Sequence, residues 1–218
     1  MITFILLAFL GLLLAVVLVA MFRTSGANKQ VAAATQARAV AATTAALQGD
    51  AWDAHIGDVV SVSAAAEDFS DLDFPVDRRS AYQTNSGRWI DLSGEFRGRR
   101  VYLEVHRHPS PLLMGLFDPR KLTIADIGLS EQQLTDFDAR QDPTASIQFA
   151  NKSWHYQSSR EIGYFENESG AGEGLYRWLF EEQGGARLIC VEKWEGEPFD
   201  VRVAVILKHE DVTVYRKS

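Results

Sequence analysis

The chain has 218 residues, with 29 acidic and 22 basic side chains and a formal net charge of −7. Nucleic-acid-binding domains carry a basic surface, so this acidic balance argues against DNA or RNA as a partner. The single cysteine, Cys190, excludes an internal disulfide, which suits a reducing compartment. Its position in the apolar run 188–191 predicts a buried thiol that packs as a small hydrophobe.

Residues 1–22 are apolar and carry no charged side chain. A helix needs about 20 apolar residues to cross the hydrocarbon core of a bilayer, so this run predicts a transmembrane helix in contact with membrane lipid. A cleaved signal peptide would have a basic start and a shorter apolar core, and a lipoprotein signal would have a cysteine directly after the run. The run is long, no Lys or Arg precedes it, and Cys190 lies far downstream.

Basic residues follow the predicted anchor at Arg23, Lys29 and Arg38, whereas only the α-amino group precedes it. The positive-inside tendency therefore predicts a single-pass protein whose C-terminal part lies in the cytoplasm. Gly11 and Ala15 form a small-xxx-small pair that would let two anchors pack closely, although small residues are common in membrane helices for other reasons.

An Ala-rich segment at 23–50 predicts a helical stalk. No Gly or Pro occurs between Ala27 and Gln48, and a helix of this length extends about 30 Å. Asn28 is placed to cap its start and Gly49 to end it. A thin apolar seam favours a semi-rigid spacer over a coiled coil, and oligomerisation through the anchor or stalk stays open. The seam consists of Ala33, Val40 and Leu47.

From residue 51 to 218 the sequence is typical of a β-rich soluble domain. In one segment Val101, Leu103 and Val105 alternate with polar residues, which indicates a half-buried strand. Short apolar runs separated by Gly-rich turns predict antiparallel sheets in sandwich or barrel form. The predicted strands are 59–62, 80–83, 89–92, 101–108, 146–150, 154–157, 162–165, 175–180, 188–192, 201–207 and 212–215.

A helical segment interrupts these strands at 119–143, where Ser130 and Gln133 form a capping-box pattern. An Arg-Trp-apolar motif at 88–90 leads through a glycine turn to a strand that ends at Glu104, and a similar order runs from 177 to 192. If this similar order is an internal repeat, the domain consists of two related β-rich halves, 51–118 and 144–218, joined by the helical segment. Chance similarity between two amphipathic hairpins explains the pattern about equally well.

The order of these features resembles the bacterial family called domain of unknown function 4178, over roughly residues 57–215. The residues that carry the resemblance are Gly57–Val60, Trp89–Leu92, Arg99–Glu104, Phe149, Trp154–Tyr156, Tyr176–Phe180 and Val191–Trp194. The resemblance implies a mostly β domain that works near membrane-stress and polyamine-synthesis proteins. With the anchor it implies a place in the bacterial inner membrane, and it transfers no catalytic residues.

One candidate metal site is formed by Glu104, His106 and His108, which alternate on one face of the predicted strand. Carboxylate and imidazole are suitable ligands for zinc or iron. Neighbours on one strand face lie about 6.5–7 Å apart, so three in a row rarely converge on one ion. The spacing therefore favours a solvated polar outer face over a metal site.

A second candidate site is the acidic segment with Glu192, Glu195 and Glu197 around Trp194. Paired carboxylates with separated pKa values carry out acid–base chemistry, and an acidic run attracts a polycation such as a polyamine. Trp194 would then offer a cation–π surface. A solvated turn is the simpler interpretation of a Glu-Gly-Glu-Pro stretch.

No metalloprotease, nucleophile-elbow or phosphate-loop motif occurs in its required context, so we assign no catalytic residue and no cofactor. The first hypothesis is a membrane-anchored, cytoplasmic, non-enzymatic scaffold that recruits a protein partner and is linked to membrane stress. The second is a binding module or weak enzyme for a small cation, a polyamine or a metal. A deep polar pocket would favour the second hypothesis, and a filled sandwich without a pocket would favour the first.

Overall fold

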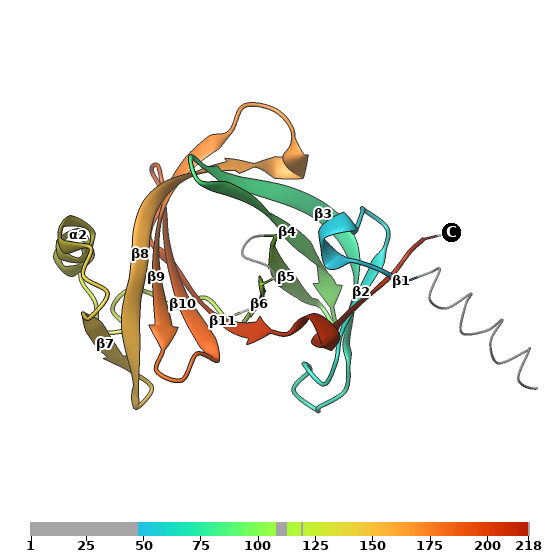
Figure 1. Ribbon diagram of the computed structural model, residues 1–218, viewed down its shortest axis with the longest axis horizontal. Helices are drawn as coiled ribbons and strands as arrows, with labels where there is room; N and C mark the ends of the chain where they lie inside the picture. Colours follow the sequence, from blue (N-terminus) through green and yellow to red (C-terminus); the bar gives the residue numbers. More distant parts are fainter. Residues whose placement is uncertain (1–47, 108–112, 119, 218) are drawn as a thin grey trace, which may run out of the picture. The chain divides into compact units, whose positions relative to one another are not determined.

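The computed structural model contains an antiparallel β-barrel, whose strands are formed by segments in which apolar and polar residues alternate (Figure 1). The structure describes residues 48–107, 113–118 and 120–217. The predicted anchor at 1–22, almost all of the predicted stalk and His108 lie outside the described residues. Among the residues described, no helix is both long and apolar enough to be a candidate membrane span.

The chain order of elements is mainly β. The strands are β1 (Gln48–Gly49), β2 (Val59–Val62), β3 (Leu72–Thr84), β4 (Gly87–Phe96), β5 (Arg99–His106), β6 (Leu113–Phe117), β7 (Ser146–Phe149), β8 (Lys152–Phe165), β9 (Glu173–Glu182), β10 (Arg187–Trp194), β11 (Asp200–Leu207) and β12 (Val212–Tyr215). The helix α2 spans Glu131–Arg140, and short 3-10 helices occupy Ala51–Asp53, Glu166–Glu168 and His209–Asp211.

Eight of the strands close into the barrel, which confirms the predicted antiparallel, mainly β class. Strands β3 to β6 form one meander and β8 to β11 form another. The meanders join where β6 pairs with β11 and where Tyr82 of β3 pairs with Tyr164 of β8. Closure removes the open edges that a flat sheet would expose. Whether the two meanders descend from one repeated unit stays a prediction.

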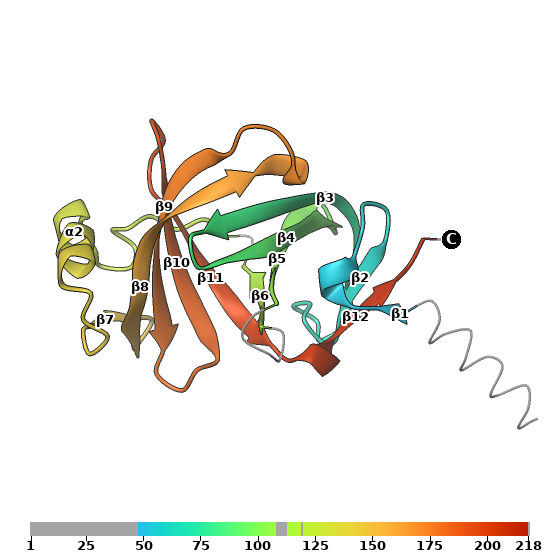
Figure 2. The same ribbon diagram turned by 45° about the horizontal axis from the view of Figure 1, so that its top comes forward.

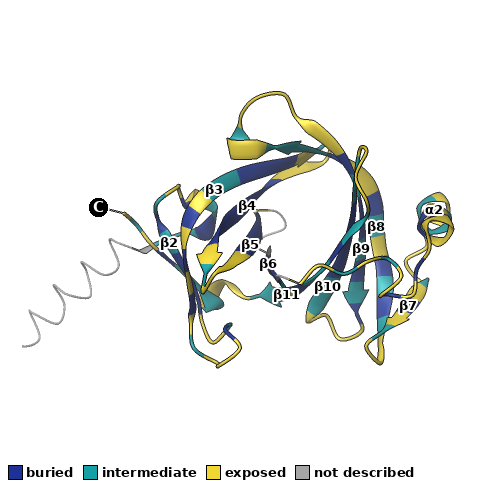
Figure 3. Ribbon diagram, turned by 180° about the vertical axis from the view of Figure 1, so that it is seen from behind, coloured by how far each residue is buried: buried dark blue, intermediate teal, exposed yellow. Residues whose placement is uncertain are grey.

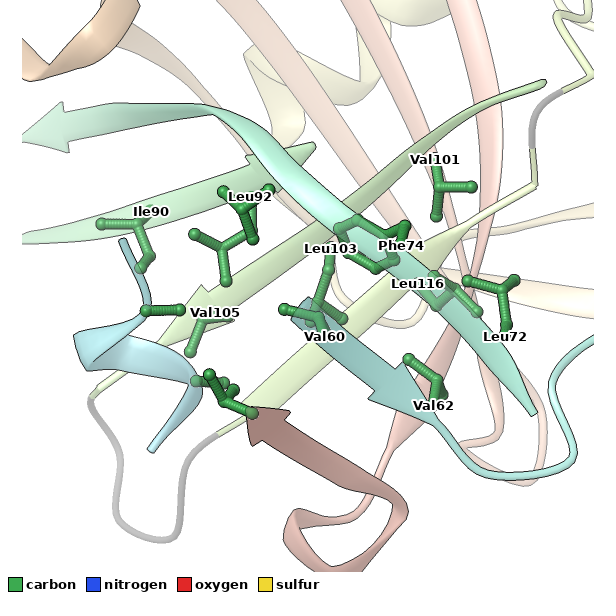
Figure 4. Close-up of a cluster of buried hydrophobic side chains, with 14 of the residues drawn as sticks. Val60, Val62, Leu72, Phe74, Ile90, Leu92, Val101, Leu103, Val105 and Leu116 are labelled. Carbon is green, nitrogen blue, oxygen red and sulfur yellow. The ribbon is translucent and has the colours of Figure 1, made fainter. Parts of the chain in front are cut away.

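One side of the barrel is covered from outside by β2, β12 and the first 3-10 helix (Figures 1 and 2). Ile90 and Leu92 of β4 pack there beside Leu103 of β5, with Val60 of β2 and Phe74 of β3 laid over them (Figure 4). Since β2 and β12 lie outside the eight barrel strands, the apolar face of β4 and β5 is the outer face. The opposite face of the same strands therefore points into the barrel.

The other side of the barrel is covered by the segment that contains α2. Its Leu134 is buried, together with Trp178 and Phe180 of β9, and the Trp178 Nε1–H donates to the Leu134 carbonyl oxygen at 3.0 Å. Ser130 and Gln133 form the predicted capping box, which is confirmed. Buried positions run along the barrel strands, whereas α2 and the hairpin turns are largely exposed (Figure 3).

A close crossing of β3 and β4 occurs at Gly94, which pairs with Val76 next to a bulge in β3. A Cβ atom at Gly94 would overlap the carbonyl oxygen of Pro75 and the ring of Phe74. This position therefore needs glycine because the two backbones lie too close for any side chain.

Two differences from the sequence prediction concern β8 and β6. The segments 154–157 and 162–165 are parts of one strand, β8, whose register shifts between Tyr156 and Ser158. The bulge absorbs the break in alternation that suggested two strands. The strand β6 was not predicted because its sequence, Leu-Met-Gly-Leu-Phe, lacks alternation of apolar and polar residues.

Candidate functional site

The inward face of the barrel carries polar and aromatic side chains together with apolar ones such as Leu175, Cys190 and Ala204. Because β3, β4 and β5 pair in register, their inward residues form rows across the three strands. The rows are Tyr82, Trp89 and His106, then Ser80, Asp91 and Glu104, then Arg78, Ser93 and Tyr102. The facing strands contribute Arg177 from β9, Glu192 from β10 and Arg202 from β11.

An ion pair crosses the interior between Arg177 and Glu104. The guanidinium binds the carboxylate with both arms, with Nη2 2.8 Å from Oε1 and Nη1 3.1 Å from Oε2. The sheet order places β6, β11 and β10 between β5 and β9, so this contact can only form through the inside of the barrel. Arg177 retains 3% of its exposure and Glu104 is also buried.

Glu192 extends the ion pair into a network. Its Oε1 accepts from Nε of Arg177 at 2.9 Å, and its Oε2 accepts from Nη2 of Arg202 at 3.0 Å. Glu192 is 1% exposed, so its charge depends on these two partners rather than on water. Two arginines and two glutamates thus balance one another inside the barrel. Burial acts to raise the pKa of Glu104, but Arg177 and His106 outweigh burial and lower that pKa to about 2.

Three stacked rings line one end of this network. Trp89 lies between Tyr82, at 5.4 Å between ring centroids, and His106, at 5.1 Å, with both pairs close to parallel. His106 Nε2 lies 3.2 Å from Oε2 of Glu104. The guanidinium of Arg177 lies 4.5 Å from the Tyr82 ring and 5.6 Å from the Trp89 ring, so it occupies the cation–π position over these aromatics.

Asp91 differs from its charged neighbours because, among the described residues, no hydrogen bond or ion pair reaches its carboxylate. It is 4% exposed and lies between Ser80 and Glu104 in the sheet register. Burial, followed by the nearby charge of Glu104, raises the pKa of Asp91 to about 7, and Arg202 and Arg78 offset only part of this rise. Asp91 is therefore a buried carboxyl group that exchanges its proton near neutral pH.

Trp89 supplies an unsatisfied donor on the same face of β4, two residues from Asp91. Its side chain is 8% exposed, and its Nε1–H finds no acceptor within the described part of the chain. Buried polar groups in native proteins are nearly always paired, so each exception calls for a cause such as a bound ligand. Arg78 Nε and Asp200 Oδ1 are also unpaired, but the ends of these side chains contact Glu166 and Lys121.

The predicted solvated outer face for Glu104 and His106 is wrong, because both residues point into the barrel. The outer face of β5 is the apolar one, and β2 and β12 cover it. Within the described ranges no group of three His, Cys, Asp or Glu side chains could hold a metal ion. Glu104 is bound by Arg177 instead, and His108 lies outside the described residues.

The predicted acidic cluster around Trp194 does not form one site. Strand alternation turns Glu192 inward, whereas Glu195 and Glu197 are exposed in the turn after β10. Trp194 is half-buried and packs edge-to-face against Tyr164 at 5.2 Å. Glu195 and Glu197 are exposed, as the interpretation of a solvated turn expects, whereas the buried Glu192 does not fit that interpretation.

Two residues at the centre of the site, Asp91 and Arg177, were not identified as functional from the sequence. The available signal was strand alternation, since Asp91 lies between Ile90 and Leu92, and Arg177 lies between Tyr176 and Trp178. A separate hollow of about 300 Å³ lies beside α2, lined by Gln133, Asp136, Phe137, Arg140, Asp142 and Ala145. None of these residues belongs to the interior network.

Comparison of the chain with protein-family models, with curated proteins and with solved structures finds no match. The resemblance to the domain of unknown function 4178 family therefore stays a prediction that rests on the residues quoted for it.

Proposed function

We propose that the barrel is a binding module that holds a small cation in its interior. The observation that carries the proposal is the Asp91 carboxylate, buried and unpaired beside a network whose charges already cancel. The carboxylates of Glu104 and Glu192 are matched by Arg177 and Arg202. Of these three inward carboxylates, Asp91 is the one that no ion pair from a described residue reaches; the guanidinium groups of Arg78 and Arg202 attract it only from a longer distance.

Physical chemistry favours a cation as that partner. An ionised carboxylate without a partner is strongly destabilised in a buried site, and it either takes up a proton or binds a positive charge. An eight-stranded barrel has room for its own side chains or for one small ligand. Arg177 and the stacked rings already occupy part of the interior, so the ligand has to be small. A charged lining also disfavours an apolar lipid.

The predicted anchor at 1–22 and stalk within 23–50 belong to the same proposal. They would hold the barrel at the cytoplasmic side of the membrane, where a bound cation could be sensed or buffered. Recruitment of a protein partner, the first hypothesis from the sequence, rests on the order of anchor, stalk and domain. We favour the binding module because of the buried groups of Asp91 and Trp89 rather than because of a pocket, since the hollow beside α2 contains neither residue.

Calorimetric titration tests this proposal on the full-length protein in a nonionic detergent at pH 8. The ligands are ammonium, ethylammonium, putrescine, spermidine and Mg²⁺. We expect at least one ligand to bind with a stoichiometry of about one, and Asp91→Asn to weaken it at least roughly tenfold, as expected for loss of a charge-assisted bond. Asp73→Asn, an exposed position on β3, is the matched control and should bind normally.

Two results would contradict the proposal. In the first, no member of the panel binds to the wild-type protein. In the second, a ligand binds equally well to the wild type and to Asp91→Asn, which would place the binding site elsewhere.

A further inference from the structure

Two unsatisfied polar groups on the inward face of β4 define what a ligand has to present. Within the described residues, no hydrogen bond or ion pair reaches the carboxylate of Asp91, which is 4% exposed. The Nε1–H of Trp89 is buried and has no acceptor there. Residues two apart on a strand face are separated by about 6.5–7 Å. A single ligand of a few heavy atoms can therefore satisfy both groups.

Aromatic recognition of a quaternary ammonium group is disfavoured here. Such ions bind to open aromatic faces, which supply the cation–π attraction. The guanidinium of Arg177 already lies over the rings of Tyr82 and Trp89, and Tyr82 and His106 stack against the Trp89 ring. The free polar group of Trp89 is thus its N–H at the ring edge rather than its face.

A metal ion is also a poor match for this position. Divalent cations collect several oxygen or nitrogen ligands, and no suitable group of three exists among the described residues. Glu104, the carboxylate next to Asp91 in the register, binds Arg177 with both oxygens. A metal ion at Asp91 would therefore have few other protein ligands.

An ammonium group with N–H donors suits the position better. Beside Asp91 in the register lies Ser80, which is fully buried and whose hydroxyl is 3.0 Å from the hydroxyl of Tyr164. A serine oxygen has two lone pairs, so it can accept from an ammonium N–H while it donates to Tyr164. Asp91 and Ser80 can then accept hydrogen bonds from two of the three ammonium N–H groups.

We propose that the ligand is a short primary ammonium compound that carries a hydrogen-bond acceptor, such as a hydroxyl or carbonyl oxygen, close to the ammonium group. The ammonium group donates a hydrogen bond to the Asp91 carboxylate, and the acceptor atom of the ligand accepts a hydrogen bond from the Nε1–H of Trp89. This inference rests on the proposed function, because it names the ligand class of the same interior site.

Three probe compounds test the inference by calorimetry on the full-length protein at pH 8. Ethanolamine has an ammonium and a hydroxyl, ethylammonium lacks the hydroxyl, and tetramethylammonium lacks N–H donors. We expect ethanolamine to bind roughly tenfold more tightly than ethylammonium, a difference equivalent to one buried hydrogen bond, and tetramethylammonium not to bind.

Trp89→Phe keeps an aromatic ring and removes the N–H, so it should erase the preference for ethanolamine over ethylammonium. Trp194→Phe is the matched control, because Trp194 packs in the same apolar cluster, and it should keep the preference. Circular dichroism reports whether each variant folds. If Trp89→Phe does not fold, the indole N–H resonance of wild-type Trp89 decides, since ethanolamine should shift it and ethylammonium should not.

Each outcome separates this inference from the proposed function. If ethanolamine and ethylammonium bind equally to the wild type, and both depend on Asp91, the inference fails and the interior cation site stands. A preference that persists in Trp89→Phe, or an indole resonance that ethanolamine does not shift, also overturns the inference. If none of the three probes binds, both the inference and the interior site fail for this ligand class.

Discussion

Arg177 has two negatively charged neighbours, Glu104 and Glu192, and almost no solvent exposure. Removal of one member of a buried ion pair leaves its partners charged and uncompensated, which typically costs about 3–5 kcal/mol. We therefore expect Arg177→Met to lower the free energy of unfolding by about that amount, measured by urea denaturation. Arg99→Met breaks an exposed pair with Glu67 and should cost under about 1 kcal/mol. Equal losses in the two variants would contradict the interior network.

Asp91 should make stability depend on pH in the direction opposite to an ordinary ion-paired carboxylate. Its pKa rises from 3.8 to about 7 on folding, so between these values the folded state holds a proton that the unfolded state releases. The contribution of Asp91 to the free energy of unfolding is therefore fully present below about pH 4 and is lost as the pH rises towards 7. The charged or titratable groups around Asp91 are Arg78 on β3, Glu104 and His106 on β5, Glu192 on β10 and Arg202 on β11.

Asp91→Asn removes this titration. Relative to the variant, the wild type should therefore lose stability between pH 4 and pH 8, by up to about 4 kcal/mol for a shift of this size. Urea denaturation of both proteins at several pH values measures the difference. Parallel pH profiles would show that Asp91 is ionised at an ordinary pKa.

The sequence identified several interior residues but placed them on the wrong side of the sheet. Alternation in Val101–His106 separates two faces correctly, yet period two does not say which face is solvated. Burial of both faces of β5, by an outer layer and by the barrel interior, is a tertiary property. Asp91 looked like an ordinary polar strand position for the same reason.

Among the elements, the α2 segment depends on its contact with β9. Trp178→Ala removes a buried ring and its bond to the Leu134 carbonyl, and should cost about 3–5 kcal/mol. Trp178→Phe keeps most of the packing and should cost about 1 kcal/mol for the lost hydrogen bond. His106→Ala should cost about 1 kcal/mol, because His106 stacks on Trp89. Urea denaturation ranks the three variants, and a larger loss for His106→Ala than for Trp178→Ala would contradict the packing described for α2.

The crossing of β3 and β4 gives a second prediction for the elements. Gly94→Ala forces a methyl group against the backbone of Pro75 and should cost about 3 kcal/mol or more through strain. Gly87→Ala is the matched control on the same strand, since nothing lies within 4 Å of its added Cβ, and it should be nearly neutral. Thermal denaturation of both variants checks the pair, and similar melting temperatures would show that the strands do not approach this closely.

Local pattern predicted most of the strands and the capped helix, whereas barrel closure could not be predicted. Strand β2 matches the expected residues 59–62, and the capping box at Ser130 was identified from four residues. Closure depends on pairings such as Tyr82 with Tyr164, which join residues far apart in the sequence. No local periodicity encodes which distant strands pair.

In the described part of the molecule, the ion pairs of Arg177 lie inside the barrel, beside two small apolar clusters. Figure 2 shows β2 and β12 on one side of the barrel and α2 on the other. The two large apolar clusters lie outside the barrel wall, one under each of these layers. These outer layers bury apolar area and stabilise the fold. Buried ion pairs are weak evidence for stability, which supports a functional reason for the charged interior.

The central claim is that Asp91 is a buried carboxyl group inside the barrel and that its carboxylate binds a cation. Its carboxyl ¹³C resonance in the full-length protein, assigned with Asp91→Asn and followed from pH 3 to pH 9, tests this most directly. We expect a midpoint near pH 7 without ligand. Saturating ethanolamine should lower the midpoint by about one pH unit or more, because a nearby cation favours the ionised form. A midpoint near that of an exposed aspartate, or one that no ammonium ligand moves, would contradict the account.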